Sequence, residues 1–158
     1  MADAGFSTLG VTLSYGVETV AGQKPTEFKL LTRINDIPEI TVTPEAIDAS
    51  TLEDKTTKNI AGRDTVTDTL GIVVNKTNET IKEWKDLITE YKALTDGKRM
   101  WFQEITPGIT EAEFFVAQPP SQLPVTAKAQ NTLSTMTMTL VIQEMIGSGE
   151  KVEPTLGE

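Results

Sequence analysis

Residues 132–142 alternate between apolar and polar side chains with a period of two. The even positions hold the apolar residues Met136, Met138, Leu140 and Ile142. In a β-strand successive side chains point to opposite faces, so such alternation buries one face and leaves the other in water. The stretch therefore predicts a long strand with a core face and a threonine-rich wet face.

Other short stretches also predict strands, separated by proline and glycine. They cover residues 28–34, about 45–50, 66–74, 99–105, 113–118 and 121–129. Pro107-Gly108 and Pro119-Pro120 fall between the later ones, and Pro124 restricts the start of the stretch 121–129 to an edge or a bend.

The two ends of the chain differ in character from the middle. Residues 1–27 are rich in glycine and small polar residues, which predicts an N-terminal arm or loop, with residues 11–15 as a candidate short strand. Residues 28–147 are expected to form one β domain. Residues 148–158 are expected to form an acidic C-terminal tail.

One amphipathic helix is predicted over residues 78–96. Ile81, Trp84, Ile88 and Tyr91 recur at steps of three and four and form its core face. Thr77 or Asn78 can act as N-cap, and Gly97 suits the position after the helix. Trp84 and Tyr91 are interpreted as core residues, because one packed helix face accounts for both.

A long polar segment follows the first predicted strand of the domain, and after the short strand near residues 45–50 it is predicted to continue as a loop to about Asp64. Asp36 to Asp54 contains six acids and no Lys or Arg, and basic residues follow at once. Loops of this length are usually functional or mobile, and adjacent charge blocks of opposite sign suit docking to an identical copy. A merely solvated loop is the alternative. The candidate docking residues are Glu45, Asp48, Glu53, Asp54, Lys55, Lys58 and Arg63.

Composition argues against an enzyme. The chain has no Cys and no His, which removes thiolate nucleophiles, imidazole bases, disulfides and Cys/His metal sites. No phosphate-binding glycine loop, dinucleotide fingerprint or nucleophile elbow is present. An oxygen-only metal site at Asp36, Asp48 or Asp64 does not match the spacing of an EF-hand calcium loop, so we predict no metal or cofactor.

Charge and hydropathy limit the partners. The formal net charge is −9 at pH 7. This charge can simply keep the protein in solution, or one surface can serve to repel a polyanion. The sequence has no cluster of basic residues of the kind that binds a specific nucleic-acid sequence. Residues 1–15 carry no signal-peptide pattern, and no stretch approaches the roughly 20 apolar residues of a membrane span, so we predict no membrane insertion.

These elements predict a mainly β (α+β) fold, an antiparallel β-sandwich or barrel with one flanking helix and a long loop. Their order resembles that of the tail tube proteins of long-tailed bacteriophages, which are related to contractile tail tubes and type VI secretion tube rings. The local phrases that agree are residues 31–38, 59–64, 96–102 and 133–140.

The resemblance implies a structural role. Such subunits form hexameric rings that stack into a tube and conduct viral DNA during infection. Their partners are other copies, tail tip or baseplate, tape measure and tail terminator proteins, and DNA passing non-specifically. The protein would be made in the host bacterial cytoplasm and reside in the virion. Thr135, Thr137 and Thr139 are candidates for the lumen, since uncharged hydroxyls would not grip phosphates.

Two other functions compete with this interpretation. One is a type VI secretion-like ring protein. The other is a monomeric phage β-sandwich module that binds a receptor or carbohydrate, which would need an exposed aromatic surface. Trp101, Phe102, Phe114 and Phe115 are the residues that could supply it.

Overall fold

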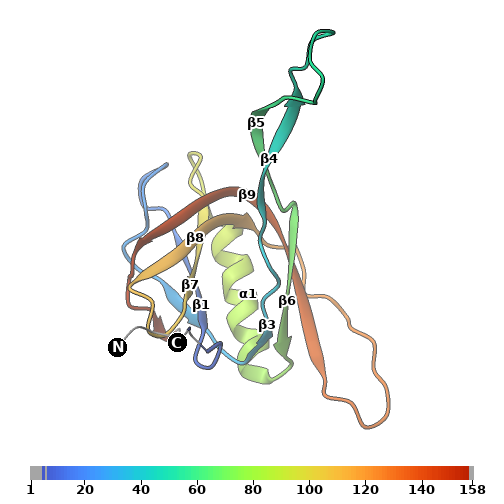
Figure 1. Cartoon of the computed structure of the whole chain (residues 1–158). Coiled ribbons are helices and arrows are strands. Elements are labelled where there is room, and N and C mark those ends of the chain that lie inside the picture. Colours follow the sequence, from blue (N-terminus) through green and yellow to red (C-terminus); the bar gives the residue numbers. More distant parts are fainter. Residues whose placement is uncertain (1–4, 6, 157–158) are drawn as a thin grey trace.

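The computed structural model describes residue 5 and residues 7–156. It is mainly β with one helix, which confirms the predicted fold class (Figure 1). The elements are β1 (Thr12–Val17), β2 (Lys29–Leu31), β3 (Ile34–Asp36), β4 (Val42–Asp48), β5 (Asn59–Val66), β6 (Thr69–Asn75), α1 (Asn78–Lys92), β7 (Met100–Ile105), β8 (Glu111–Gln118), β9 (Thr135–Glu150) and β10 (Thr155–Leu156).

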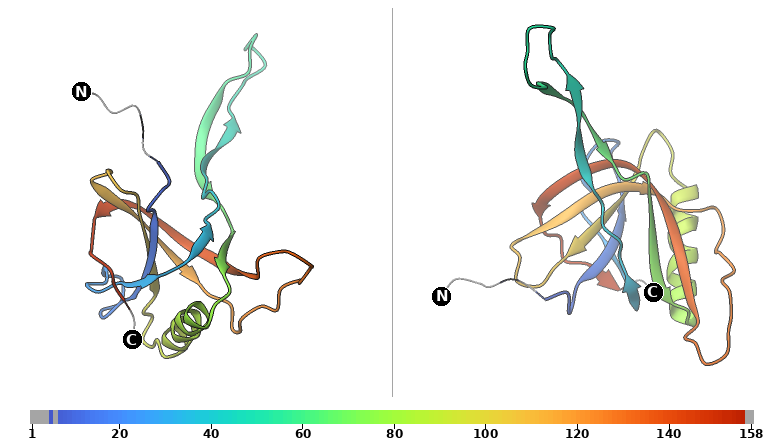
Figure 2. Two further views of the ribbon diagram at one scale, coloured as in Figure 1. Left: turned by 90° about the horizontal axis from the view of Figure 1, so that it is seen from below. Right: turned by 45° about the vertical axis from the view of Figure 1, so that its right-hand side comes forward.

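Eight strands form one curled sheet in the order β10-β2-β1-β7-β8-β9-β6-β3, and β4 and β5 form a separate hairpin. Pairing is antiparallel except between β10 and β2. The sheet curls into a half-barrel with α1 beside it, and the hairpin projects beyond the rest of the molecule (Figures 1 and 2).

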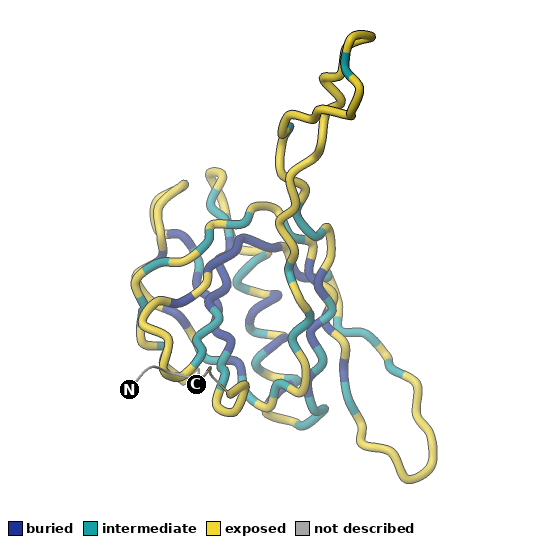
Figure 3. Tube along the Cα trace, viewed as in Figure 1, coloured by how far each residue is buried: buried dark blue, intermediate teal, exposed yellow. Residues whose placement is uncertain are grey.

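The main core lies between α1 and the inner face of the sheet. Met136, Met138 and Leu140 of β9 are fully buried there, as the alternating pattern predicts. Trp84, Leu87 and Ile88 of α1 pack against them. A second apolar cluster of Phe28, Trp101, Ala112, Phe114 and Val116 lies apart from this core. Figure 3 shows that burial is concentrated in the sheet and helix.

Local hydrogen bonds fix the start of α1 and attach it to the sheet. The Thr77 side chain accepts from the Thr80 N–H at 3.1 Å, and the Thr80 hydroxyl accepts from the Thr77 N–H at 2.9 Å. Glu83 on the helix accepts from the Thr32 N–H at 3.0 Å, which binds the helix to the link between β2 and β3. The helix ends at Lys92, four residues before the predicted end.

Two predicted elements are wrong. Residues 121–129 form no strand, because the prolines release the chain from β8 at Gln118 and it returns only at Thr135. The predicted polar loop ends earlier, because residues 59–64 form β5 opposite β4 rather than loop. The loop itself is therefore confined to residues 49–58.

The structure also places parts of both ends of the chain within the sheet. The candidate short strand in the predicted arm is β1, which lies between β2 and β7. The final strand β9 continues to Glu150 along β8, and β10 pairs with β2. The boundary predicted at residue 27 thus falls between β1 and β2 of one sheet, and the boundary predicted at residue 147 falls inside β9.

Candidate assembly interface

The β4–β5 hairpin presents apolar side chains to solvent. Ile47 and Ile60 lie directly opposite one another and expose 48% and 58% of their surface. A Cβ on Gly62 would come within 3.0 Å of the Ile47 side chain, so the glycine leaves room for Ile47 to lie across the hairpin. Two-stranded hairpins are marginal in water, and exposed apolar patches of this kind mark interaction sites. Sequence reasoning selected only the charged residues of this segment.

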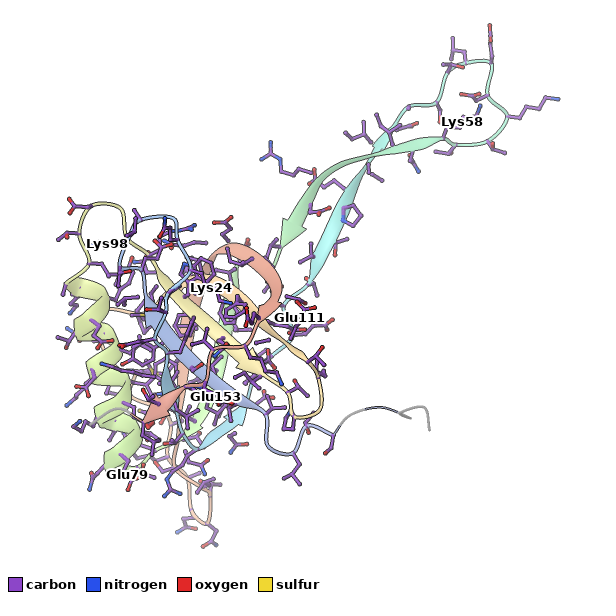
Figure 4. All side chains as sticks on the ribbon, turned by 90° about the vertical axis from the view of Figure 1, so that its left-hand side faces the viewer. Lys24, Lys58, Glu79, Lys98, Glu111 and Glu153 are labelled. Atoms are coloured by element: carbon purple, nitrogen blue, oxygen red, sulfur yellow. The ribbon has the colours of Figure 1, made fainter. Side chains whose placement is uncertain are left out.

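The tip of the hairpin is held by its own hydrogen bonds. Asp54 accepts from the Thr51 N–H at 2.8 Å and pairs with Lys58 at 3.0 Å. These contacts, the backbone bond first, hold the pKa of Asp54 below its ordinary value. The Lys58 N–H also donates to the Ser50 hydroxyl at 2.7 Å. The loop between β4 and β5 is therefore closed by contacts of its own, and Lys58 is labelled near the far end of the hairpin in Figure 4.

The predicted docking residues consequently fall into two groups. Asp54 and Lys58 neutralise each other, and Asp48 accepts from the Ser50 N–H at 2.9 Å, which lowers the pKa of Asp48. The other members have no ion pair or side-chain hydrogen bond within the described part of the chain. These are Glu45 on β4, Glu53 and Lys55 in the loop, and Arg63 on β5.

The threonines of β9 lie on the sheet face opposite the core. Thr137 and Thr139 are exposed and Thr135 is partly buried. Thr137 and Thr139 face Val73 and Gly71 of β6, and a Cβ on Gly71 would approach the Thr137 methyl at 3.2 Å. Neither β6 nor residues 135–143 carry a charged side chain. This face is polar and uncharged.

The four residues of the predicted helix face all pack against the core, but they differ in how deeply they are buried. Trp84 and Ile88 are buried, while Ile81 and Tyr91 are partly buried against the same cluster. The Trp84 indole N–H has no hydrogen-bond partner among the described residues.

The four aromatics of β7 and β8 are all buried, so none forms an exposed binding surface. Phe102 and Phe115 stack in the main core at 5.4 Å between ring centroids. Trp101 and Phe114 pack edge to face at 6.1 Å in the second cluster, beside Phe28. The interpretation as a carbohydrate-binding module required an exposed aromatic surface, and these four residues do not supply one.

Sequence reasoning missed a buried carboxylate that connects three parts of the sheet. The side chain of Glu18 is fully buried and accepts from the Trp101 indole at 2.8 Å and the Arg99 N–H at 2.7 Å. Burial alone would raise the pKa of Glu18, but these hydrogen bonds hold it below its ordinary value. Arg99 also pairs with Glu144 of β9. Sequence spacing gave no signal for Glu18, because its side-chain partners Trp101 and Arg99 lie about 80 residues away along the chain.

A pair of carboxylates faces a groove near β3. Glu104 and Glu113 lie directly opposite each other on β7 and β8, and the segment after β3 lines the same groove. Burial, and then the charge of Glu113, raises the pKa of Glu104. Neither side chain has an ion pair or hydrogen bond to the described residues, which leaves two like charges adjacent.

The described residues contain no group of three or more potential metal ligands. Within the same residues, no helix combines the length and the apolar character needed to cross a bilayer.

No protein-family model matches the chain, and no curated protein matches it. Among solved structures, it is similar to a chain in the six-fold symmetrised cryo-EM structure of the anti-feeding prophage baseplate. The TM-score is 0.54 at 13% identity, and the match covers 92% of this chain and 95% of that chain. The chain thus has the fold of a component of that phage-like assembly over almost its whole length.

Proposed function

We propose that the protein is a structural subunit of a phage tail tube, which assembles into stacked hexameric rings that conduct viral DNA. The observation that carries this proposal is the hairpin, which projects from the sheet with exposed apolar side chains. A segment that cannot stabilise itself is expected to be covered by a partner. The similarity to a baseplate component supports the class of assembly.

The hairpin is proposed to contact the next ring. Its apolar pair Ile47 and Ile60 would supply the hydrophobic part of that contact, and Glu45, Lys55 and Arg63 would supply polar contacts around it. A contact between different surfaces of identical copies repeats indefinitely, which is the symmetry that a tube requires.

The β6–β9 face is proposed to line the channel. Thr135, Thr137 and Thr139 present hydroxyl and methyl groups without charge. Such a wall leaves no cation to hold a phosphate backbone, so DNA would pass without binding. In the particle, tail tip or baseplate, tape measure and tail terminator proteins would complete the set of partners, after synthesis in the bacterial cytoplasm.

A ring within a baseplate is a second candidate, because the similar solved chain belongs to a baseplate structure. The two roles differ in the number of rings that stack. A tube subunit can add rings without limit, whereas a baseplate ring stops after one or a few layers.

Negative-stain electron microscopy of purified protein across a concentration series tests both roles. Tubes of variable length support the tube subunit, and isolated six-fold rings support the baseplate role. A protein that stays monomeric at every concentration, by light scattering and microscopy, would refute both.

A further inference from the structure

β9 and the continuous segment formed by β5 and β6 lie side by side at the base of the hairpin and then separate, which leaves an open fork between β5 and the second half of β9. β9 pairs with β6 from Thr135 to Val141, and the Ile142 N–H then donates to the Asp68 carbonyl at 2.9 Å. Beyond this junction β5 rises into the hairpin while β9 curves away along β8 (Figure 1).

Each arm of the fork has one edge without a strand beside it. β3 pairs with β6, and β4 pairs with β5, on the same side of the segment 59–75. The other side of this segment is occupied by β9 along β6 and is free along β5. The matching edge of β9 over residues 143–150 also has no strand partner among the described residues. Long unpaired edges are sites for strand addition.

A second segment of the same chain is strand-like and lacks a partner. Residues 121–129 are predicted to form a strand, yet they form none: Leu123 packs against the main core, and the loop that follows projects away from the sheet (Figures 1 and 2). Val125 in this loop is 89% exposed. The Thr126 hydroxyl donates to the Thr135 carbonyl at 2.6 Å, and within the described residues the segment makes no other hydrogen bond to the sheet.

The charges of the two segments are complementary. Lys128 is the one charged residue between Glu113 and Glu144, in a chain of net charge −9. Residues 142–150 of β9 carry Glu144 and Glu150 and no basic side chain, but Arg99 already pairs with Glu144 and the Lys24 ammonium donates to the Glu150 carbonyl. The loop therefore meets no like charge at this edge, so it can approach an identical, acidic copy without repulsion.

We propose that residues 121–129 of one copy add as a strand to the free edge of β9, over residues 143–150, in a neighbouring copy. This contact deepens the proposed function, on which it rests, by naming the segments that join one subunit to the next. The loop and the edge are different surfaces, so the contact is head-to-tail and can close a ring.

The shape of β9 favours this occupant over a second β9. Bulges interrupt its register with β8 between Phe114 and Phe115 and between Val116 and Ala117. Bulges bend a strand and prevent two such edges from pairing directly. A loop without regular hydrogen bonds of its own can follow the bend.

Pro124 sets the direction in which the added strand must face. Proline has no N–H, so residue 124 must point away from β9, and N–H groups at the odd positions 125 and 127 must point toward it. Ala127→Pro is therefore expected to raise the concentration needed for assembly at least tenfold. Lys128→Pro is expected to match Lys128→Ala, which controls for the lost charge. Equal effects of Ala127→Pro and Lys128→Pro would overturn the proposed pairing.

Cross-linking gives a direct readout, because the chain contains no cysteine. Single-cysteine variants Val125→Cys and Ser148→Cys, or Val125→Cys and Ile146→Cys, are mixed, assembled and oxidised. A disulfide-linked dimer is expected in at least one mixture, since strand partners lie within disulfide distance. Val125→Cys mixed with Lys85→Cys, on the exposed side of α1, is the matched control.

The outcomes separate the two proposals. Tubes or rings that form without a disulfide in either test mixture would overturn the strand addition and leave the structural role intact. Failure of the unmodified protein to assemble at all would overturn both.

Discussion

The apolar face of the hairpin gives the sharpest test of the assembly hypothesis. We consider the double substitution Ile47→Ser and Ile60→Ser. These side chains are opposite one another and about half exposed in the single chain, at 48% and 58%. They make no contact with the core between α1 and the sheet, because they lie on the separate two-stranded hairpin.

Burying an isoleucine side chain completely is worth about 1.5–3 kcal/mol. Covering the exposed half of each in an assembly therefore contributes about 0.75–1.5 kcal/mol per residue. The double variant should lose about 1.5–3 kcal/mol per contact, which raises the critical concentration for assembly roughly 10- to 150-fold. The free energy of unfolding should change little, with Tm within about 2 °C of the parent.

Sedimentation across a concentration series measures the critical concentration, and circular dichroism during heating measures Tm. Val20→Ser is the matched control, because Val20 is 53% exposed but lies in the loop after β1, away from the hairpin. An unchanged critical concentration in the double variant would refute the interface. A Tm lowered by more than about 5 °C would show instead that the two isoleucines stabilise the isolated chain.

Three further predictions concern single sites. Glu18→Gln should cost about 2–4 kcal/mol of unfolding free energy in urea titrations, because a buried hydrogen-bonded charge is lost beside Arg99; a cost under 0.5 kcal/mol contradicts this. Glu104→Gln should stabilise the protein at pH 7. The gain should shrink as the pH falls, because the raised pKa makes the folded wild type take up a proton before the unfolded chain; a pH-independent difference in urea midpoint argues against it. Lys at both Thr137 and Thr139 should reduce DNA ejection from particles more than tube assembly, and normal ejection removes these residues from the channel.

The parts of the fold that were predictable from sequence are those with local periodicity. β9 alternates so regularly that its buried face follows from the sequence, and the apolar stripe of α1 places Trp84 in the core. Both patterns depend on one chain segment packing against a core, whatever the rest of the chain does.

The errors arise where tertiary or intermolecular contacts decide. Residues 121–129 have strand-like composition but no neighbouring strand within one chain, so they stay extended. Residues 59–64 show no strand-like alternation and the sequence predicts a loop there, yet β4 supplies the backbone hydrogen bonds that make them a strand. The candidate site was located by its charges, whereas the exposed apolar pair lay within the same segment and was overlooked.

The hairpin and the strand-like loop share a physical property that makes assembly the simplest explanation of both. Each exposes groups that a protein normally covers: apolar side chains on the hairpin, and backbone N–H and C=O groups without a strand partner in the loop. The fully buried side chains of the main core, such as Trp84, Met136 and Met138, lie outside both segments. A single chain that is complete in its core and incomplete at two separate surfaces has the design expected of a repeating subunit, because each copy can supply what the next one lacks.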